Sequence, residues 1–264
     1  MNLRIVKVTS LVIFLCLLVG QLSAQDMSEF RNEEFIQSQD TLKYRILYPE
    51  KMKNGEKYPL VLFLHGSGER GGDNQKQLTH GAKLFVDKTM REKYPAFVLF
   101  PQCPNNVMWS HRKKKKSERD DWIFNFPLEP EPTKPAGLVN QLIEKMLGSE
   151  LVDTNQVYIM GLSMGGIGAL EFLYRWPEKY SAAVVICGGN DPQFASVYCH
   201  IPVWFFHGGK DNVVPQKFSQ AVYDELKKRN LNTKYTLYPD ANHNSWDPAL
   251  AEPDLLKWLF KERE

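Results

Sequence analysis

The segment Gly-Leu-Ser-Met-Gly at 161–165 constrains the fold most strongly, because it lies between a strand-like and a helix-like run. Residues 157–160 are apolar and rich in strand formers, and 167–175 have helical spacing up to Trp176-Pro177. A turn this sharp needs glycine on both sides of the serine, since side chains there would collide with backbone. The pattern therefore predicts a strand-to-helix turn that holds the Ser163 hydroxyl above a sheet.

The rest of the chain alternates between strand-like and helix-like segments, which is typical of an α/β fold. The first two strand-like segments predict a hairpin turned at residues 39–40, and helix-like stretches separate most later strands, with amphipathic surface helices at 216–229 and 252–261. We expect a single domain with a doubly wound, mainly parallel eight-stranded sheet. Its strands are expected at 33–37, 42–48, 60–64, 97–101, 156–160, 182–187, 202–206 and 234–238.

A serine at its ordinary pKa is a poor nucleophile, so Ser163 needs a base and an acid. Asp211 follows the apolar strand 202–206, and His243 follows the strand 234–238. Functional groups of open α/β sheets gather at these carboxyl ends of strands. The order serine, aspartate, histidine is also that of hydrolases with this turn. His243 is the expected base, and Asp211 is expected to orient its ring.

Other residues compete for both roles. Asp191 follows the strand at 182–187 and is the alternative acid, although Asp211 is favoured. Asp240 and Asp247 flank His243 too closely to turn back onto its ring, so they are expected to cap turns. Among the other histidines, two at strand ends are expected to brace loops and three have no motif around them; in that order they are His65, His207, His80, His111 and His200.

The apolar strand 60–64 runs into a glycine-rich loop at 66–74. Such a loop leaves backbone amides uncovered. The amides of Ser67 and Met164 are therefore the expected oxyanion donors. A phosphate-binding loop is disfavoured, because no Gly-Lys-Ser/Thr ending follows the glycines.

Several motifs together resemble the α/β-hydrolase superfamily over nearly the whole chain after residue 30. Within it, the chain is similar to prolyl-oligopeptidase-like predicted peptidases and to carbohydrate esterases of the feruloyl and acetyl-xylan type. The motifs are His-Gly-Ser-Gly-Glu-Arg-Gly at 65–71, Phe-Pro-Gln-Cys-Pro at 100–104, Gly-Leu-Ser-Met-Gly-Gly at 161–166, His-Gly-Gly-Lys-Asp at 207–211 and His-Asn-Ser-Trp-Asp at 243–247.

The resemblance implies hydrolysis of an ester through an acyl-enzyme, with Ser163, Asp211 and His243 as the triad. It adds Trp109 and Trp246 as walls of the acyl or leaving-group pocket. The favoured substrates are feruloyl or acetyl esters of plant polysaccharide. A serine peptidase is the alternative, but the chain lacks that family's large propeller domain. A non-catalytic carbohydrate-binding protein is a further alternative, against which the intact turn and residue order argue.

The segment at about 105–135 does not fit this alternation of strands and helices. His111-Arg112 is followed by four lysines at 113–116, by acids within 118–121 and by four prolines. A lysine run could bind nucleic acid or an anionic polymer, but a solvated loop partly neutralised by the nearby acids is favoured. We expect an irregular charged insertion that covers one side of the site.

The amino terminus predicts export. Arg4 and Lys7 precede an apolar run at 11–19, and Leu22-Ser23-Ala24 offers small residues for cleavage. We therefore expect a signal peptide at 1–24, a catalytic domain at 25–264, and a secreted or periplasmic location with no membrane attachment after cleavage. A lipidated Cys16 is disfavoured, because large residues precede it.

Composition limits the partners. Without the first 25 residues, which hold Arg4 and Lys7 but no acid, 31 of the 33 basic residues face 31 acidic ones. This balance does not favour nucleic-acid binding. The three remaining cysteines, Cys103, Cys187 and Cys199, permit at most one internal disulfide. No metal-ligand spacing or cofactor motif is visible, so neither a metal nor an organic cofactor is expected.

Overall fold

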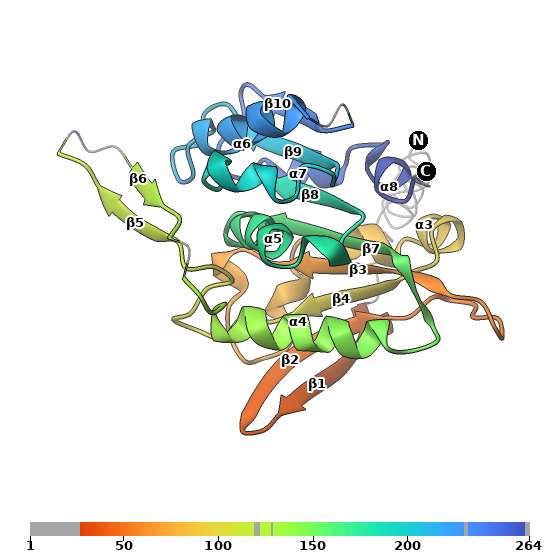
Figure 1. Cartoon of the computed structure of the whole chain (residues 1–264). Coiled ribbons are helices and arrows are strands. Elements are labelled where there is room, and N and C mark those ends of the chain that lie inside the picture. The colour runs from red at the N-terminus through yellow and green to blue at the C-terminus, as the bar shows by residue number, and fades with distance from the viewer. Residues whose placement is uncertain (1–26, 119–121, 128, 230–231, 262–264) are drawn as a thin grey trace, which may run out of the picture.

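A computed structural model describes residues 27–118, 122–127, 129–229 and 232–261. Eight strands form one sheet in the order β1-β2-β4-β3-β7-β8-β9-β10. The pairs β1·β2 and β2·β4 are antiparallel and the other pairs are parallel, which confirms the predicted sheet (Figure 1). The strands are β1 (Arg31–Gln37), β2 (Asp40–Leu47), β3 (Tyr58–Leu64), β4 (Phe97–Pro101), β7 (Val152–Leu162), β8 (Ala182–Ile186), β9 (Val203–Gly208) and β10 (Lys234–Tyr238).

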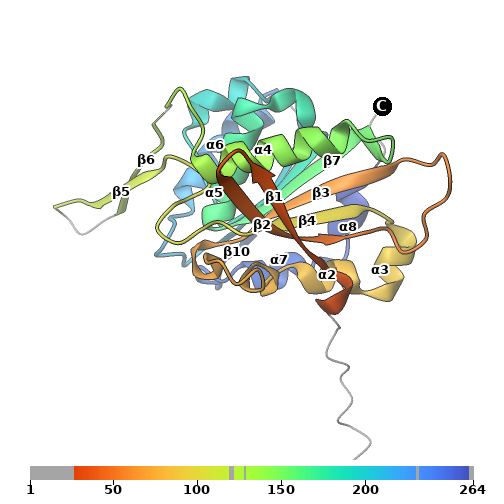
Figure 2. The same ribbon diagram turned by 90° about the horizontal axis from the view of Figure 1, so that it is seen from below.

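Helices cover both faces of the sheet (Figures 1 and 2). On one face lie α4 (Lys134–Leu147), α5 (Met164–Arg175) and α6 (Lys217–Lys227). On the other lie α2 (Ala82–Val86), α3 (Lys88–Lys93), α7 (Trp246–Leu250) and α8 (Leu255–Leu259). Short 3₁₀ turns complete the described elements: η1 (Met27–Glu29), η2 (Ser67–Glu69), η3 (Lys76–Leu78), η4 (Pro177–Lys179) and η5 (Pro192–Ser196).

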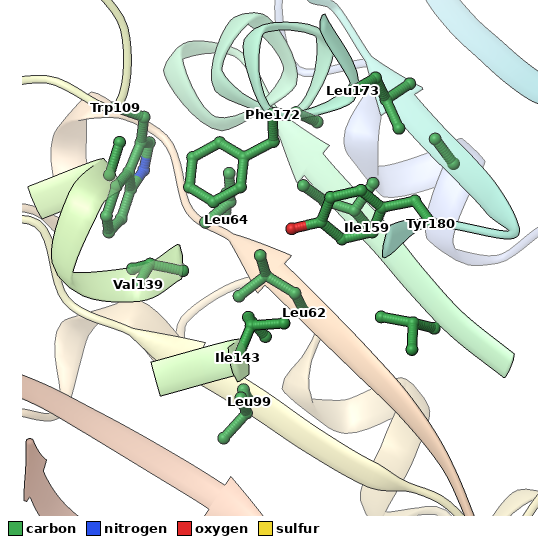
Figure 3. Packing of buried hydrophobic residues seen from close by; sticks show 14 of the residues in the cluster. Leu62, Leu64, Leu99, Trp109, Val139, Ile143, Ile159, Phe172, Leu173 and Tyr180 are labelled. Atoms are coloured by element: carbon green, nitrogen blue, oxygen red, sulfur yellow. The ribbon is translucent and has the colours of Figure 1, made fainter. Parts of the chain in front are cut away.

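The central strand β3 explains why helices are needed on both sides. Its side chains alternate, so Leu60, Leu62 and Leu64 enter the core under α4 and α5, while Val61 and Phe63 enter the core on the opposite face. Figure 3 shows the first of these cores, with Leu62 and Leu64 among its labelled side chains. A strand buried on both faces has no polar side, and for that reason it reads as a continuous apolar run.

The first hairpin turn occupies residues 38–39, one position before the predicted turn, with Ser38 at φ 55°. Cys103, Cys187 and Cys199 are all free thiols in this structure. The predicted signal peptide at 1–24 lies outside the described residues. Within the described part of the chain, none of the helices combines the length and apolar character that crossing a membrane requires.

The segment at 105–135 departs from the predicted irregular loop. Strands β5 (Lys113–Lys116) and β6 (Trp122–Asn125) pair antiparallel as a separate hairpin that stands out from the body of the molecule (Figure 1). Lysine has low strand propensity, so its run gave no local strand signal. The prolines also misled the prediction, because Pro135 lies in the first turn of α4, whose cap is Thr133.

Candidate active site

The strand-to-helix turn has the strained geometry that its glycines suggest. Ser163 lies between β7 and α5 with φ 51° and ψ −115°, a backbone conformation that residues other than glycine rarely adopt. A Cβ atom at Gly161 would lie 2.1 Å from the carbonyl oxygen of Gly165. A Cβ atom at Gly165 would lie 1.9 Å from the carbonyl oxygen of Leu64. Neither position accepts a side chain, so the turn brings Ser163 close to the end of β3.

Ser163, His243 and Asp211 form a continuous hydrogen-bonded chain. Ser163 Oγ lies 2.8 Å from His243 Nε2, and His243 Nδ1 lies 2.7 Å from Asp211 Oδ2. Ser163 follows β7, Asp211 follows β9 and His243 follows β10, so three strand ends supply the three groups. Ser163 is 8% exposed, so it is largely buried where β7 turns into α5.

The alternative acid lies elsewhere. Asp191 caps η5, where its carboxylate accepts hydrogen bonds from the backbone and side-chain amides of Gln193. It is partly exposed and is engaged in local structure. Of the two candidate acids, Asp211 is the one that the structure brings to the His243 ring.

Asp211 is held as a carboxylate by its hydrogen-bond donors. Burial raises its pKa, but hydrogen bonds from His207 and His243 outweigh burial and hold the pKa well below its usual range. The amides of Val213 and Val214 both donate to Asp211 Oδ1 at 2.9 Å. These donors fix the carboxylate in the orientation that faces the His243 ring.

His207 was expected only to brace a loop, but the structure also places it against the acid. Its ring is fully buried, with Nε2 3.3 Å from Asp211 Oδ2 and 2.9 Å from the Val214 carbonyl oxygen. Its Nδ1 lies 2.7 Å from Ser219 Oγ, which in turn lies 2.9 Å from the Tyr235 hydroxyl. In the sequence, His207 and Asp211 are four residues apart and two glycines follow His207. This short, glycine-containing spacing is the pattern from which the contact could have been predicted.

The oxyanion donors were predicted in two segments that the structure brings together. Met164 is the first residue of α5, where amides have no acceptor within the helix. Ser67 begins η2, and a Cβ atom at the preceding Gly66 would lie 2.8 Å from Leu162 Cδ1. The loop that holds Ser67 therefore passes directly against the turn that holds Ser163.

His65 holds this loop in place, as the sequence suggests. Its Nε2 accepts a hydrogen bond from the Cys103 amide at 2.9 Å, so the proton is on Nδ1, which donates to the Gly66 carbonyl oxygen at 2.6 Å. Burial lowers the pKa of His65 to about 4, so the ring is neutral at neutral pH.

The two tryptophans that were predicted as pocket walls have different positions. Trp109 is 0% exposed and packs in the core beneath α5, where its indole N–H donates to the His65 carbonyl oxygen at 3.1 Å (Figure 3). A fully buried ring cannot line a pocket, so the structure corrects this prediction. Trp246 does lie beside the site, with its ring centroid 5.5 Å from that of His243.

An aromatic cluster that the sequence did not reveal borders the site. Phe124 packs with Ile167 and Val214, and partly buried Phe126 and Phe218 join them. Ile167 lies one turn past Ser163 in α5, and Val214 is bonded to Asp211. The ring centroid of Phe124 lies 4.9 Å from that of Phe218. The second hairpin thus carries aromatic surface to the two loops that hold the serine and the acid.

One group of possible metal ligands appears in space although no sequence spacing indicated it. Cys187, Asp211 and His243 each offer a ligand atom, and these atoms lie within 4.8 Å of one another. A thiol must lose its proton to bind a metal, and burial followed by the Asp211 charge raises the pKa of Cys187 far above its usual value. The His243 nitrogen and Asp211 oxygen that face each other are also already bonded. The group therefore suits the proton relay better than a cation.

The fold and this chain of groups define an α/β hydrolase, as the resemblance implied. A family model described as phospholipase/carboxylesterase matches residues 51–253, so the chain belongs to that family. It is 27% identical over 199 residues to a probable carboxylesterase, SOBER1-like, of Arabidopsis thaliana. The match covers 70% of this chain and 72% of the plant protein. The chain is therefore an enzyme of the carboxylic ester hydrolase class.

Solved structures agree with this assignment. A thermostable esterase matches with a TM-score of 0.78 and 33% identity over 88% of this chain, which spans 63% of that protein's length. A ferulic acid esterase from the anaerobic fungus Anaeromyces mucronatus matches with a TM-score of 0.60 and 16% identity over 88% of each chain. The second likeness shows the shared fold.

Proposed function

We propose that the protein is a secreted serine carboxylesterase that cleaves esters of an aromatic or small acyl group, of the feruloyl or acetyl type, attached to plant polysaccharide. The single observation that carries the catalytic part is the chain from Ser163 through His243 to Asp211, with successive distances of 2.8 and 2.7 Å. Its groups have the identity, order and contacts that nucleophilic acyl transfer needs.

In the proposed mechanism, Ser163 Oγ attacks the ester carbonyl carbon while His243 Nε2 takes its proton. Asp211, held ionised by its donors, orients the ring and stabilises the imidazolium. The imidazolium then gives its proton to the leaving alcohol, and an acyl-enzyme remains. Water attacks the acyl-enzyme by the same relay, which releases the acid and restores Ser163.

The amides of Met164 and Ser67 are the proposed donors to the oxyanion. They lie at the start of α5 and at the start of η2, on the two segments that meet at Leu162. One such donor is worth about 2.7–4 kcal/mol of transition-state stabilisation in enzymes of this kind. The positive end of the helix dipole at Met164 adds to this field.

The aromatic cluster supports an aryl-containing substrate. Phe126 and Phe218 are partly buried beside Ile167 and Val214, and Trp246 stands next to His243. Aromatic rings favour offset or edge contacts with another ring, which a feruloyl group would supply. We place these side chains, in place of Trp109, as walls of the proposed pocket.

The experiment that tests this proposal is a substrate panel with the purified protein. Feruloyl and acetyl esters of sugars are compared with aminoacyl amides, with Ser163→Ala as the blank and a fluorophosphonate probe to report the nucleophile. We expect the probe to label Ser163 and the esters to be cleaved faster than the amides. Preferential cleavage of amides would refute the esterase proposal and favour a peptidase.

Secretion is a separate part of the proposal. It rests on the basic, apolar and small-residue segments that precede Gln25 in the sequence. Amino-terminal sequencing of the mature protein, recovered from the medium or the periplasm, is the direct measurement. A mature protein that begins at Met1 would contradict it.

A further inference from the structure

Within the described residues, no carboxylate forms an ion pair with either of two arginines at the border of the candidate site. Arg70 lies in the loop of Ser67, where its Nε donates to the Ser67 carbonyl oxygen at 3.0 Å and its Nη1 to the Val107 carbonyl oxygen at 3.3 Å. Arg112 precedes β5 and has its guanidinium carbon 5.2 Å from the ring centroid of Phe124. One arginine thus belongs to the oxyanion loop and the other to the aromatic cluster.

The guanidinium group of Arg112 is incompletely satisfied. Its Nε is buried and has no hydrogen-bond partner among the described residues, and its Nη2 contacts a weak acceptor, Met108 Sδ, at 3.8 Å. Burial, and after it the charge of Arg70, lower its pKa. Buried polar atoms of proteins nearly always have partners, so an orphaned charged donor indicates a group that the protein alone does not supply.

Further positive charge lies close to the two arginines. The Lys114 ammonium lies 5.7 Å from the same Phe124 ring, and its pKa is lowered by burial and then by the charges of Arg112 and Lys116. The acid next to Arg70 in the sequence is Glu69, and its Oε1 lies 3.9 Å from His80 Nε2. No carboxylate of the described residues pairs with Arg70 or Arg112. By contrast, Lys113 on the same hairpin lies 3.8 Å from Glu129.

Both arginines contact segments that adjoin Ser163. Phe124, on which Arg112 lies, contacts Ile167, whose amide donates to the Ser163 carbonyl oxygen at 3.0 Å. Arg70 is anchored to Ser67, the proposed oxyanion residue. A guanidinium group presents a planar fork of donors that matches a carboxylate. The whole chain has 33 basic and 31 acidic residues, so this concentration of positive charge is a local feature.

We propose that Arg70 and Arg112 form a subsite for a carboxylate carried by the ester substrate, on either its acyl or its alcohol part. This inference rests on the proposed esterase function and narrows its substrate class to esters with an anionic group. An acidic sugar next to the ester, or a dicarboxylic acyl group, has this chemistry.

The experiment compares matched esters that differ by one charge. On the acyl side, the mono-para-nitrophenyl ester of glutarate is compared with para-nitrophenyl methyl glutarate. On the alcohol side, para-acetoxybenzoate is compared with its methyl ester. The readout is the ratio of kcat/KM for the charged ester to that for the neutral ester, measured at low and at high salt.

We expect Arg112→Gln and Arg70→Gln each to lower this ratio about tenfold for one of the two pairs, which is the size of one lost charge-assisted hydrogen bond. Arg112→Lys keeps the charge but loses the fork, so it should restore part of the ratio. Lys113→Gln is the matched control, because it removes a hairpin charge that already has an acid. Its ratio should equal that of the unaltered protein.

A measurement on the unaltered protein covers the case in which the variants misfold. Para-hydroxybenzoate should inhibit hydrolysis of a neutral ester more strongly than methyl para-hydroxybenzoate does, and added salt should reduce the difference. Equal inhibition, or ratios that both arginine variants leave unchanged in both pairs, would overturn the subsite alone. If no ester is cleaved faster than by Ser163→Ala, the proposed function fails and the subsite fails with it.

Discussion

The two polar regions beside Ser163 differ in how completely their groups are paired. On the acid side, Asp211, His207, Ser219 and Tyr235 form an unbroken series of contacts, and Asp211 alone receives two backbone amides. On the basic side, formed by Arg70 and Arg112, the buried Nε of Arg112 has no hydrogen-bond partner in the part of the chain that the structure describes. A satisfied network holds a catalytic group in one orientation, whereas an unsatisfied one has donors left for a ligand.

The contrast assigns different tasks to the two regions. The acid side is closed to solvent, since the side chains of His207 and Asp211 are 0% exposed, and it can only act through His243. The basic side is partly exposed and can contact a substrate directly. Changes on the acid side should therefore alter turnover for all esters alike, while changes on the basic side should alter the preference among esters.

The largest effect is expected at the point where both regions meet. Ser163→Ala removes the nucleophile, so kcat should fall by about 10⁶ for charged and neutral esters alike. Thermal unfolding should be little changed, which shows that the loss is chemical. A variant that keeps most of its turnover would show that another group does the chemistry.

A smaller but still large effect is expected for the acid. Asp211→Asn keeps a hydrogen bond but favours the wrong tautomer of the His243 ring, so kcat should fall by about 10⁴. Asp191→Asn is the matched control, because Asp191 only caps η5, and its kcat should change by less than about threefold. A greater loss at Asp191 than at Asp211 would reverse the assignment.

His207 tests whether the acid side acts as one network. His207→Leu removes a donor to Asp211, so kcat should fall roughly ten- to a hundredfold, the equivalent of one hydrogen bond to a charged group. His207→Gln can still place a donor there and should recover part of the loss. The ratio for charged and neutral esters should stay constant in both variants. A changed ratio would contradict the division between the two regions.

The smallest expected effect is on stability in acid. The pKa of Asp211 is depressed in the folded protein, so the unfolded state binds the proton more readily and stability rises with pH through that range. The contribution is present above about pH 4, the ordinary range of an aspartate, and is lost as pH falls toward the folded value. We expect a loss on the order of 1 kcal/mol or more, measured by denaturant unfolding at several pH values. In His207→Leu the pKa should be less depressed, so a pH slope as steep as that of the parent would count against this account.

The sequence predicted all eight strands of the main sheet and their mainly parallel direction, but not their order in the sheet. These rest on local signals: continuous apolar runs for strands buried on both faces, and glycines where a side chain has no room. Local signals of the same kind put Ser163, Asp211 and His243 just after predicted strands. The carboxyl ends of parallel strands lie at one edge of the sheet, so residues that are distant in sequence meet there. The sheet order seen in the structure then sets how close these three residues lie to one another.

Only the tertiary structure decided what surrounds them. A lysine run became β5 because it pairs with β6, and Trp109 became core because α5 and the His65 loop cover it. The aromatic cluster and the arginine pair likewise join segments that are distant in sequence. Sequence patterns report which residues repeat along one element and where glycine is required. The burial of a side chain and the residues that it contacts depend on which elements pack together. Contacts between segments that are distant in sequence determine that packing.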